Sequence, residues 1–229
     1  AMPQRIAISL TFSALAATLV GIAEYYTDIT DHGTIERFKM GAIGFEVLLG
    51  SVTVGGTLVA AGKLQEWLPS KPLTFKGQNL VNALLALLTV GHLVYLVIDP
   101  SNAPAFALMI ASALVLGVML VLPIGGADMP VVVALLNSYS GLAACATGFA
   151  IDNQILIISG ALDGASGFIL SMLMSKAMNR SFANVLFGAF GSETKAVASK
   201  GAGAMTVSPI SLEDAAMQLG YAQLVIVIP

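Results

Sequence analysis

The chain has 229 residues, of which 57% are hydrophobic and only 10% are charged, and its mean hydropathy is +0.88. Soluble domains are about half apolar and about one-quarter charged, so this composition excludes an ordinary soluble protein and indicates a chain embedded in a lipid bilayer. The formal net charge of -3, without a basic patch, gives no support for nucleic acid as a partner.

Six stretches are apolar and long enough to cross a membrane. A transmembrane helix needs about 20 mostly apolar residues to span a hydrocarbon core of roughly 30 Å. Four stretches are uncharged and two contain a single acid: 6 to 23, 40 to 62, 80 to 98, 100 to 127, 129 to 151 and 153 to 175. The sequence therefore predicts an all-α polytopic membrane protein, a bundle of about six transmembrane helices. The alternative is that one pair is a buried helical hairpin.

The basic residues near the predicted helix ends indicate an orientation, because such residues stay on the cytoplasmic side during insertion. One side of the bundle holds Arg37 and Lys39. The other side holds the larger set: Arg5, Lys63, Lys71, Lys76, Lys176 and Arg180. We therefore expect both termini in the cytoplasm, or in the equivalent compartment of an organelle.

The two ends of the chain differ in character from its middle. The opening AMPQRIAISL lacks the pattern of a cleavable signal peptide and begins almost inside a helix, so we expect further sequence upstream. After the membrane domain, residues 1 to 180, the composition turns small, polar and Gly-rich, which predicts a hinge or linker at 181 to 208. Residues 209 to 229 then offer Ser211 as a helix N-cap, Gly220 as a stop and the apolar strand LVIVI. We expect the truncated start of an α/β, Rossmann-like domain there.

An asparagine lies deep in the fifth apolar stretch. Asn137 follows Asp128 by nine residues, which places it about 13 Å along the helix and close to the middle of the bilayer. Gly141, Ala144 and Gly148 share its face of the helix, and such small residues allow a neighbouring helix to approach closely. Asn137 is therefore either an interhelical hydrogen-bonding group or part of a polar path for an ion or a proton.

The last apolar stretch contains a carboxylic acid at a similar depth. Gly160, Gly164 and Gly167 form a close-packing face, and Asp163 lies about ten residues from the preceding turn. An ionisable residue there costs roughly 2.5 to 3.5 kcal/mol on insertion scales, so it is a functional candidate by default. Because a tight turn joins the two helices, Asp163 and Asn137 are expected at similar depth. A hydrogen-bonded packing residue is the alternative.

Three further polar residues have simpler explanations. Glu46 lies about 10 Å from Lys39 along its helix, where packing or pairing is favoured. His92 lies nearer the membrane interface, which favours an anchoring role over proton transfer. Asp128 stands where an N-cap is expected, ahead of Pro130. We find no internal repeat at this stage.

Several long motifs carry a resemblance to a known family. GGADMPVVVALLNSYSG, GALDGASGFIL and MSKAMNRSF, with MPQ near the start and GKLQ after the second helix, resemble the membrane domain of the beta subunit of proton-translocating nicotinamide nucleotide transhydrogenase. The resemblance covers nearly all of residues 2 to 191. It implies that this domain passes protons while two soluble domains transfer hydride between NAD(H) and NADP(H). The segment from about 209 is similar to the opening of the NADP(H)-binding domain. The family's Gly-rich phosphate loop would follow Pro229, so we expect neither nucleotide, and no metal, on this chain alone.

The resemblance also implies roles for individual residues. Asn137 matches a residue of the proton path, and Asp128 matches one at the cytosolic mouth. With the midplane acid, the proton-path candidates are Asn137, Asp163, Asp128 and Ser140. The positions linked to helix packing, coupling and the hinge are Gly141, Gly164, Ser166, Lys176 and Arg180. One departure stands out, since Leu10 occupies the place of a first-helix histidine found in many members. The relay would then use a histidine of a partner subunit or Asp163.

The family resemblance also implies an assembly and a location. We expect other transhydrogenase subunits or domains as partners, a homodimer of the complete assembly, and contact with membrane lipid. The expected location is the bacterial inner membrane, with the mitochondrial inner membrane as the alternative. A secondary transporter or an ion-coupled channel subunit is the rival function, although a transporter should show a repeat or broken helices. A noncatalytic scaffold would explain the small-residue faces but not a midplane acid.

Overall fold

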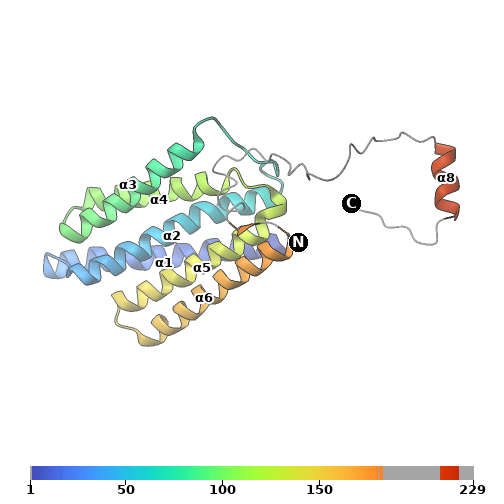
Figure 1. Ribbon diagram of the computed structural model, residues 1–229. Helices are drawn as coiled ribbons and strands as arrows, with labels where there is room; N and C mark the ends of the chain where they lie inside the picture. The colour runs from blue at the N-terminus through green and yellow to red at the C-terminus, as the bar shows by residue number, and fades with distance from the viewer. Residues whose placement is uncertain (1, 180, 183–211, 222–229) are drawn as a thin grey trace. The chain divides into compact units, whose positions relative to one another are not determined.

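The structure is a computed structural model that describes residues 2–179, 181–182 and 212–221. Six long helices form the membrane part: α1 (Met2–His32), α2 (Arg37–Leu64), α3 (Gln78–Ile98), α4 (Ala103–Val121), α5 (Met129–Ala150) and α6 (Gln154–Ala177). A short 3-10 helix, η1 (Gly126–Asp128), precedes α5. By length and composition all six can cross a membrane, which confirms the prediction (Figure 1).

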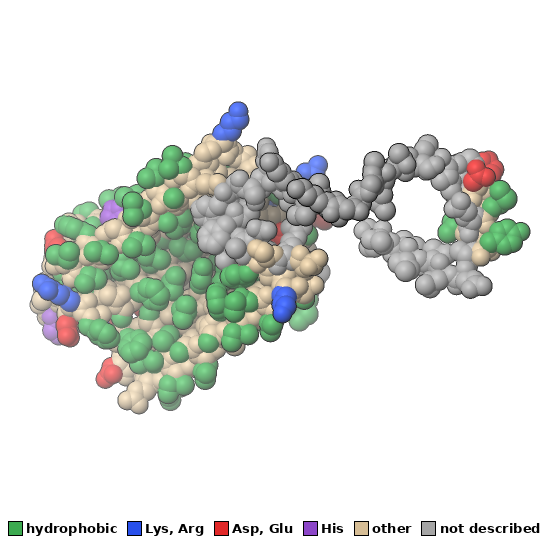
Figure 2. All heavy atoms as spheres, viewed as in Figure 1, with side chains coloured by type: hydrophobic (Ala, Val, Ile, Leu, Met, Phe, Trp, Pro, Cys, Tyr) green, Lys and Arg blue, Asp and Glu red, His purple; other side chains and the backbone are tan. Residues whose placement is uncertain are grey.

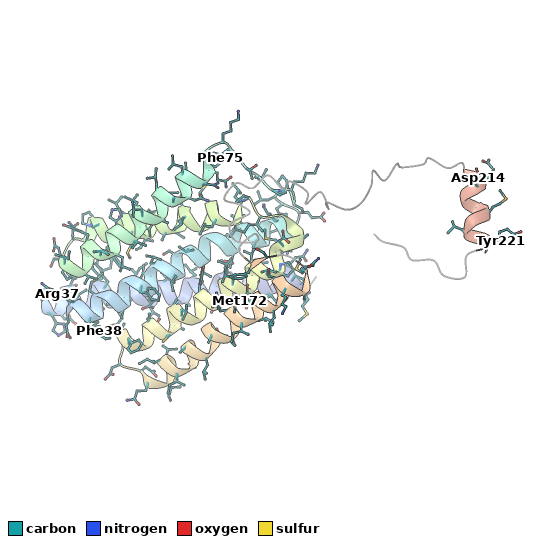
Figure 3. The ribbon with its side chains drawn as sticks, viewed as in Figure 1. Arg37, Phe38, Phe75, Met172, Asp214 and Tyr221 are labelled. Atoms are coloured by element: carbon teal, nitrogen blue, oxygen red, sulfur yellow. The ribbon has the colours of Figure 1, made fainter. Side chains whose placement is uncertain are left out.

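Helix α2 is the centre of the bundle. It packs against α1, α3, α4 and α5, whereas α6 packs on α5 at the edge of the bundle (Figure 1). Successive helices run in opposite directions, so the helix ends gather at two ends of the bundle. We call the end where α2 begins the Arg37 end and the end where α6 finishes the Lys176 end. Arg37 and Phe38 mark the first of these, and Met172 lies on α6 (Figure 3).

The surface chemistry fits a membrane. Hydrophobic side chains cover the middle of the face seen in Figure 2, and charged side chains lie toward the two ends of the bundle. The described members of the larger basic set, Arg5, Lys63, Lys71, Lys76 and Lys176, belong to the Lys176 end, as the helix order requires. The separation of the two basic sets therefore follows from the fold. The side of the membrane that each end faces stays a prediction.

Glycines allow α2 and α4 to touch through their backbones. A Cβ added at Gly55 would collide with the Leu114 backbone, and one added at Gly117 would collide with the Val52 carbonyl oxygen. Such contacts leave no room for any side chain. The position of α4 against the central helix thus depends on two residues that contribute no side chain of their own.

Two helix lengths differ from the sequence prediction. Helix α1 continues to His32, well past the apolar stretch, because Glu24 and Asp28 meet Lys39 of α2 at 3.3 and 2.8 Å. Helix α4 ends at Val121, earlier than predicted. Pro123 and Gly125 cannot continue a regular helix well, and they lie in the connection to η1.

Lys63 fastens the connection between α4 and α5. Its side chain is 1% exposed, and its ammonium group donates to the carbonyl oxygens of Leu122 and Ile124, the latter at 2.7 Å.

Lys63→Met should lower the free energy of unfolding by about 1 to 3 kcal/mol, because two carbonyl groups lose their donor. Denaturant titration in detergent measures the change. Lys71→Met, at an exposed position, is the control and should stay within about 0.5 kcal/mol of the parent. Equal stabilities for the two variants would contradict the role of Lys63.

The chain divides into two compact units, 1–193 and 194–229. In the second, α8 (Leu212–Tyr221) confirms the predicted helix, with Glu213 and Asp214 in its first turn. Gly220 lies inside this helix rather than ending it. Ser211, most of the predicted linker and the predicted strand at 224–228 lie outside the described residues, so the Rossmann-like domain and the boundary at 180 stay predictions.

Candidate functional site

The structure brings Asn137 and Asp163 together. Asn137 lies on α5 and Asp163 on α6, and the Asn137 Nδ2 is 3.5 Å from the Asp163 Oδ1. The two helices form an antiparallel hairpin with a short turn at 151–153. Asn153 starts α6, because its side chain accepts a hydrogen bond from the Leu156 amide at 3.1 Å. The expected match in depth is confirmed, and the structure adds that the two side chains face one another.

Small residues make this meeting possible. A Cβ added at Gly141 would lie 2.8 Å from the Asp163 Oδ2, and one added at Gly160 would collide with the Cys145 backbone. One residue after Asn137, the Ser138 hydroxyl donates to the Gly164 carbonyl oxygen at 2.6 Å. The close approach of α5 and α6 therefore sets the distance between the amide and the carboxyl group. This confirms the predicted close-packing face of α6.

The acid lies on the outside of this chain. Asn137 is half-buried, whereas Asp163 is exposed, because α6 packs on α5 through its small residues and turns its other faces outward. Ser166 is also exposed, and its hydroxyl donates to the Asp163 carbonyl oxygen at 3.0 Å. Ser140 is buried on α5. The site is thus open on one side, between α5 and the lateral surface of α6.

Asp128 differs from its predicted structural role. It is buried and occupies the N-cap position of α5, but its side chain makes no capping hydrogen bond. The reason is local, since η1 runs directly into α5 and gives Asp128 a helical backbone (φ -92°, ψ -5°) rather than the extended one that a capping side chain needs. The capping explanation from the sequence is therefore wrong. Asp128 lies at the Lys176 end of the bundle.

The basic hinge candidates lie at the same end. Lys176, in the last turn of α6, is exposed and lines an open hollow of about 420 Å³. The other lining residues are Met172, Asn179, Ser181 and Phe182. The ring of Phe182 meets that of Phe168 edge to face, with centroids 5.6 Å apart, which holds the start of the following segment against α6. Arg180 lies outside the described residues.

The whole chain, residues 1–229, matches the family model described as NAD(P) transhydrogenase beta subunit. The chain belongs to this family. Two curated relatives from Rhodospirillum rubrum, both named NAD(P) transhydrogenase subunit beta, are 43% identical over 234 residues, which cover 100% of this chain and 50% of each relative. The chain therefore spans about half the length of the relatives it matches. The recognition of the family from the sequence motifs is confirmed.

In this transhydrogenase family chain, α1 and α5 carry a repeat that our sequence analysis missed. Pro3, Ala7, Ser13, Leu15 and Gly21 recur at a constant offset as Pro130, Ala134, Ser140, Leu142 and Gly148. The contacts repeat as well, because α1 donates a hydroxyl hydrogen bond to α2 where α5 donates one to α6. These bonds join Thr11 to Thr57 at 2.9 Å and Ser138 to Gly164 at 2.6 Å. Residues of these types recur in many membrane helices, so the sequence match by itself is weak. The shared contacts are the evidence that α1 and α5 correspond.

The repeat makes Leu10 the equivalent of Asn137. Leu10 is 6% exposed and belongs to an apolar cluster with Met129, Val132 and Leu136. It fills the core where the family resemblance led us to expect a histidine, so α1 offers no titratable group at that level.

His92 of α3 bonds through its Nδ1 to the Leu88 carbonyl oxygen of its own helix at 2.8 Å. The sequence favoured packing or pairing for Glu46 and counted Lys63 among the basic residues near helix ends, but it did not predict that both side chains are buried.

Proposed function

We propose that this chain is the membrane part of a proton-translocating transhydrogenase, in which proton passage is coupled to hydride transfer between NAD(H) and NADP(H). The observation that carries the proposal is the meeting of Asn137 and Asp163 within spanning helices of a chain of this family. A scaffold has no use for a carboxyl group and an amide aimed at one another at that depth.

The pair has the chemistry of a proton relay. An ionised Asp163 accepts hydrogen bonds only, and the Asn137 amide nitrogen is a suitable donor to it. Once Asp163 is protonated, its hydroxyl can donate to the amide oxygen of a rotated Asn137. Asn137 is therefore a partner for both states of the acid, and Ser140, buried one turn further along α5, extends the polar path toward the next helices.

The energy of one proton is sufficient to drive the coupled reaction. Moving one charge through a potential of 100 mV is worth about 2.3 kcal/mol, which corresponds to a roughly fifty-fold change in nucleotide affinity when it appears as coupling energy. Hydride transfer between two similar nicotinamides is nearly balanced, so a change of this size sets its direction. The complete enzyme needs only to transmit the protonation state to its nucleotide domain.

Transmission runs toward the Lys176 end in this proposal. Gly141 and Gly164 hold α5 and α6 so closely that a shift at Asp163 moves both helices, and Ser166 bonds to the Asp163 backbone. Asp128, Lys176 and Arg180 then form the charged contact region with the nucleotide-binding domain. Since Lys176 stands in the last turn of α6, a rotation of that helix moves its charge directly.

The nucleotides themselves belong to other parts of the complete enzyme. A pyrophosphate binds at a helix N-terminus that presents free amide groups and positive potential. The first turn of α8 carries Glu213 and Asp214, whose carboxylates repel such a group. This helix does not fit a phosphate, so we assign no nucleotide-binding step to it.

Partner helices would cover the open side of the site. An exposed acid in the middle of a spanning helix is unfavourable against lipid, which favours polar groups of another subunit packed beside Asp163 and Ser166. We propose further transhydrogenase subunits or domains there, within a homodimer of the complete assembly. The proposed setting is the bacterial inner membrane, or the mitochondrial inner membrane, with the Lys176 end and both termini of the chain in the cytoplasm or matrix. A transporter would also carry a repeat, but family membership favours the transhydrogenase.

The proposal is tested by reconstituting the full-length protein with its partner subunits in vesicles, and by measuring hydride transfer and vesicle acidification together. Asp163→Asn should shift the pH profile of coupled turnover, because the relay loses its titrating group. Ser159→Ala, a small change on an exposed position of the same helix, is the control. A pH profile equal to that of the parent would make Asp163 a packing residue, and turnover without proton movement would overturn the proposed function.

A further inference from the structure

A second carboxylic acid is buried far from the Asn137–Asp163 pair. Glu46 of α2 is 0% exposed and lies where α1, α2 and α5 meet. A Cβ added at Gly21 of α1 would lie 3.2 Å from the Glu46 Oε2. Among the residues that the structure describes, neither carboxyl oxygen of Glu46 makes a hydrogen bond of regular geometry, and its polar neighbours are the Thr147 side chain and the Gly21 backbone. An unpaired carboxylate in such a place is strongly unfavourable, whereas a protonated acid is tolerated.

The polar neighbour of Glu46 on α5 can accept a hydrogen bond from the protonated form. Thr147 interacts with the Glu46 side chain, and the Thr147 hydroxyl already donates to the Ala143 carbonyl oxygen at 3.0 Å. The proton of that hydroxyl is therefore in use, while its oxygen can still accept a hydrogen bond. A carboxylate cannot donate, but a carboxylic acid can. The surroundings of Glu46 thus favour a side chain that carries a proton.

We propose that Glu46 is a proton-binding station on a path between α1 and α2, loaded from the Arg37 end and separate from the Asn137–Asp163 pair. The proposal rests on the proposed function, because it adds a step to the same proton movement. Thr147, the neighbour of Glu46, lies ten residues closer to the Arg37 end of α5 than Asn137 does. At about 1.5 Å per residue, the station therefore lies about 15 Å nearer that end than Asn137.

Charged groups connect the station to the Arg37 end. Glu24 lies one turn beyond Gly21 on α1, and its charge acts on Glu46. Lys39, on the same helix as Glu46, lies 3.3 Å from Glu24 and 2.8 Å from Asp28, so its charge is taken by those two acids. The side chains of Lys39 and Glu24 are both 30% exposed, which gives protons access from the surface. From α5 the facing group is the neutral Thr147 hydroxyl.

Hydroxyl groups continue the path toward the Lys176 end. Thr53 and Thr57 lie on the same face of α2 as Glu46, at helical spacing, and both are fully buried. Thr18 of α1 packs at Gly50, midway between Glu46 and Thr53. At the far end Thr11 of α1 donates to the Thr57 hydroxyl at 2.9 Å. The hydroxyls of Thr18, Thr53 and Thr57 donate to carbonyl oxygens of their own helices, so the line passes a proton to the level of Leu10 only when these hydroxyls rotate.

The test uses the full-length enzyme with its partner subunits, and compares Glu46→Gln with Glu36→Gln. Glu36 is an exposed acid at the Arg37 end and makes no capping bond, so it is a matched control. Infrared difference spectroscopy during turnover should show the carbonyl band of a buried neutral acid in the parent and in the control. We expect Glu46→Gln to lose this band and to lower proton translocation about tenfold. A band that survives in Glu46→Gln, or translocation at the parental rate, would overturn the proposal.

Two further measurements keep the outcome unambiguous. If Glu46→Gln fails to assemble, Glu46→Asp retains an acid and should shift the infrared band while translocation continues. An unshifted band in Glu46→Asp would reject Glu46 as its source. Asn137→Ala lowers turnover and should weaken the Glu46 band, but it should leave the frequency of the band unchanged, because the two groups lie about 15 Å apart along the bundle. If the band is shown not to come from Glu46, the proposal for Glu46 fails and the proposed function is unaffected. If turnover proceeds without proton movement, the proposed function fails, and the presence or absence of the band still shows whether Glu46 carries a proton.

Discussion

Replacing Asn137 by alanine should lower proton translocation and hydride transfer together, by about 10- to 100-fold. The Asn137 amide is the group that meets Asp163, at 3.5 Å, and alanine cannot donate to a carboxylate or accept from an acid. Both activities fall because the coupled enzyme cannot turn over one without the other. Vesicle acidification and nucleotide absorbance, recorded in the same reconstituted sample, measure the two rates.

The matched control for this change is Asn79→Ala. Asn79 is a half-buried asparagine in the first turn of α3, on a helix that packs against α2 and α4. The same truncation there should leave both rates near those of the parent. Proton-coupled turnover retained in Asn137→Ala would remove Asn137 from the path. A fall in hydride transfer alone would separate this residue from proton movement and would contradict the relay.

Gly117→Ala should destabilise the bundle by about 3 kcal/mol or more, the largest structural effect that we expect from a single methyl group. The added Cβ would occupy the space of the Val52 carbonyl oxygen on the central helix. A backbone group cannot rotate aside as a side chain can, so α4 must move away from α2. Since α2 also contacts α1 and α5, the displacement reaches the helices that carry the proposed proton paths.

Gly91→Ala supplies the control for this prediction. Gly91 lies inside α3 and has open space around it, since no heavy atom beyond its own turns of helix would lie within 4 Å of an added Cβ. Alanine is the better helix former, so this change should be neutral or slightly stabilising. Thermal unfolding in detergent, followed by circular dichroism, measures both variants. Equal midpoints for Gly117→Ala and Gly91→Ala would show that α2 and α4 do not touch through their backbones.

Sequence reasoning worked best where one local pattern decides the structure. The apolar stretches predicted the six helices, since a chain in lipid must satisfy its backbone hydrogen bonds within each segment. The glycines of α6 predicted a close-packing face, and the helical rise predicted that Asn137 and Asp163 lie at similar depth. The quoted motifs were long enough to identify the family.

The predictions from the sequence were wrong or incomplete where residues elsewhere in the chain decide the local structure. Lys63 was counted only among the basic residues near the helix ends, but its ammonium group donates to two carbonyl groups of the α4–α5 connection. Asp128 was expected to cap α5, but the preceding 3-10 turn gives it a helical backbone. Helix α1 extends to His32 because its acids meet Lys39 of α2, which the hydropathy of α1 does not reveal.

The sequence by itself determined the membrane character, the number of spans, the family and the two polar residues at mid-membrane depth. These follow from composition, periodicity and helical rise, which are properties of the chain read locally. Only the tertiary structure decided that Asp163 lies on the open side of α6, and that Glu46 is enclosed by three helices with no regular hydrogen bond to its carboxyl oxygens among the described residues. The rotation of each helix about its axis is set by packing against its neighbours, and hydropathy that is high on every face of a helix leaves that rotation undetermined.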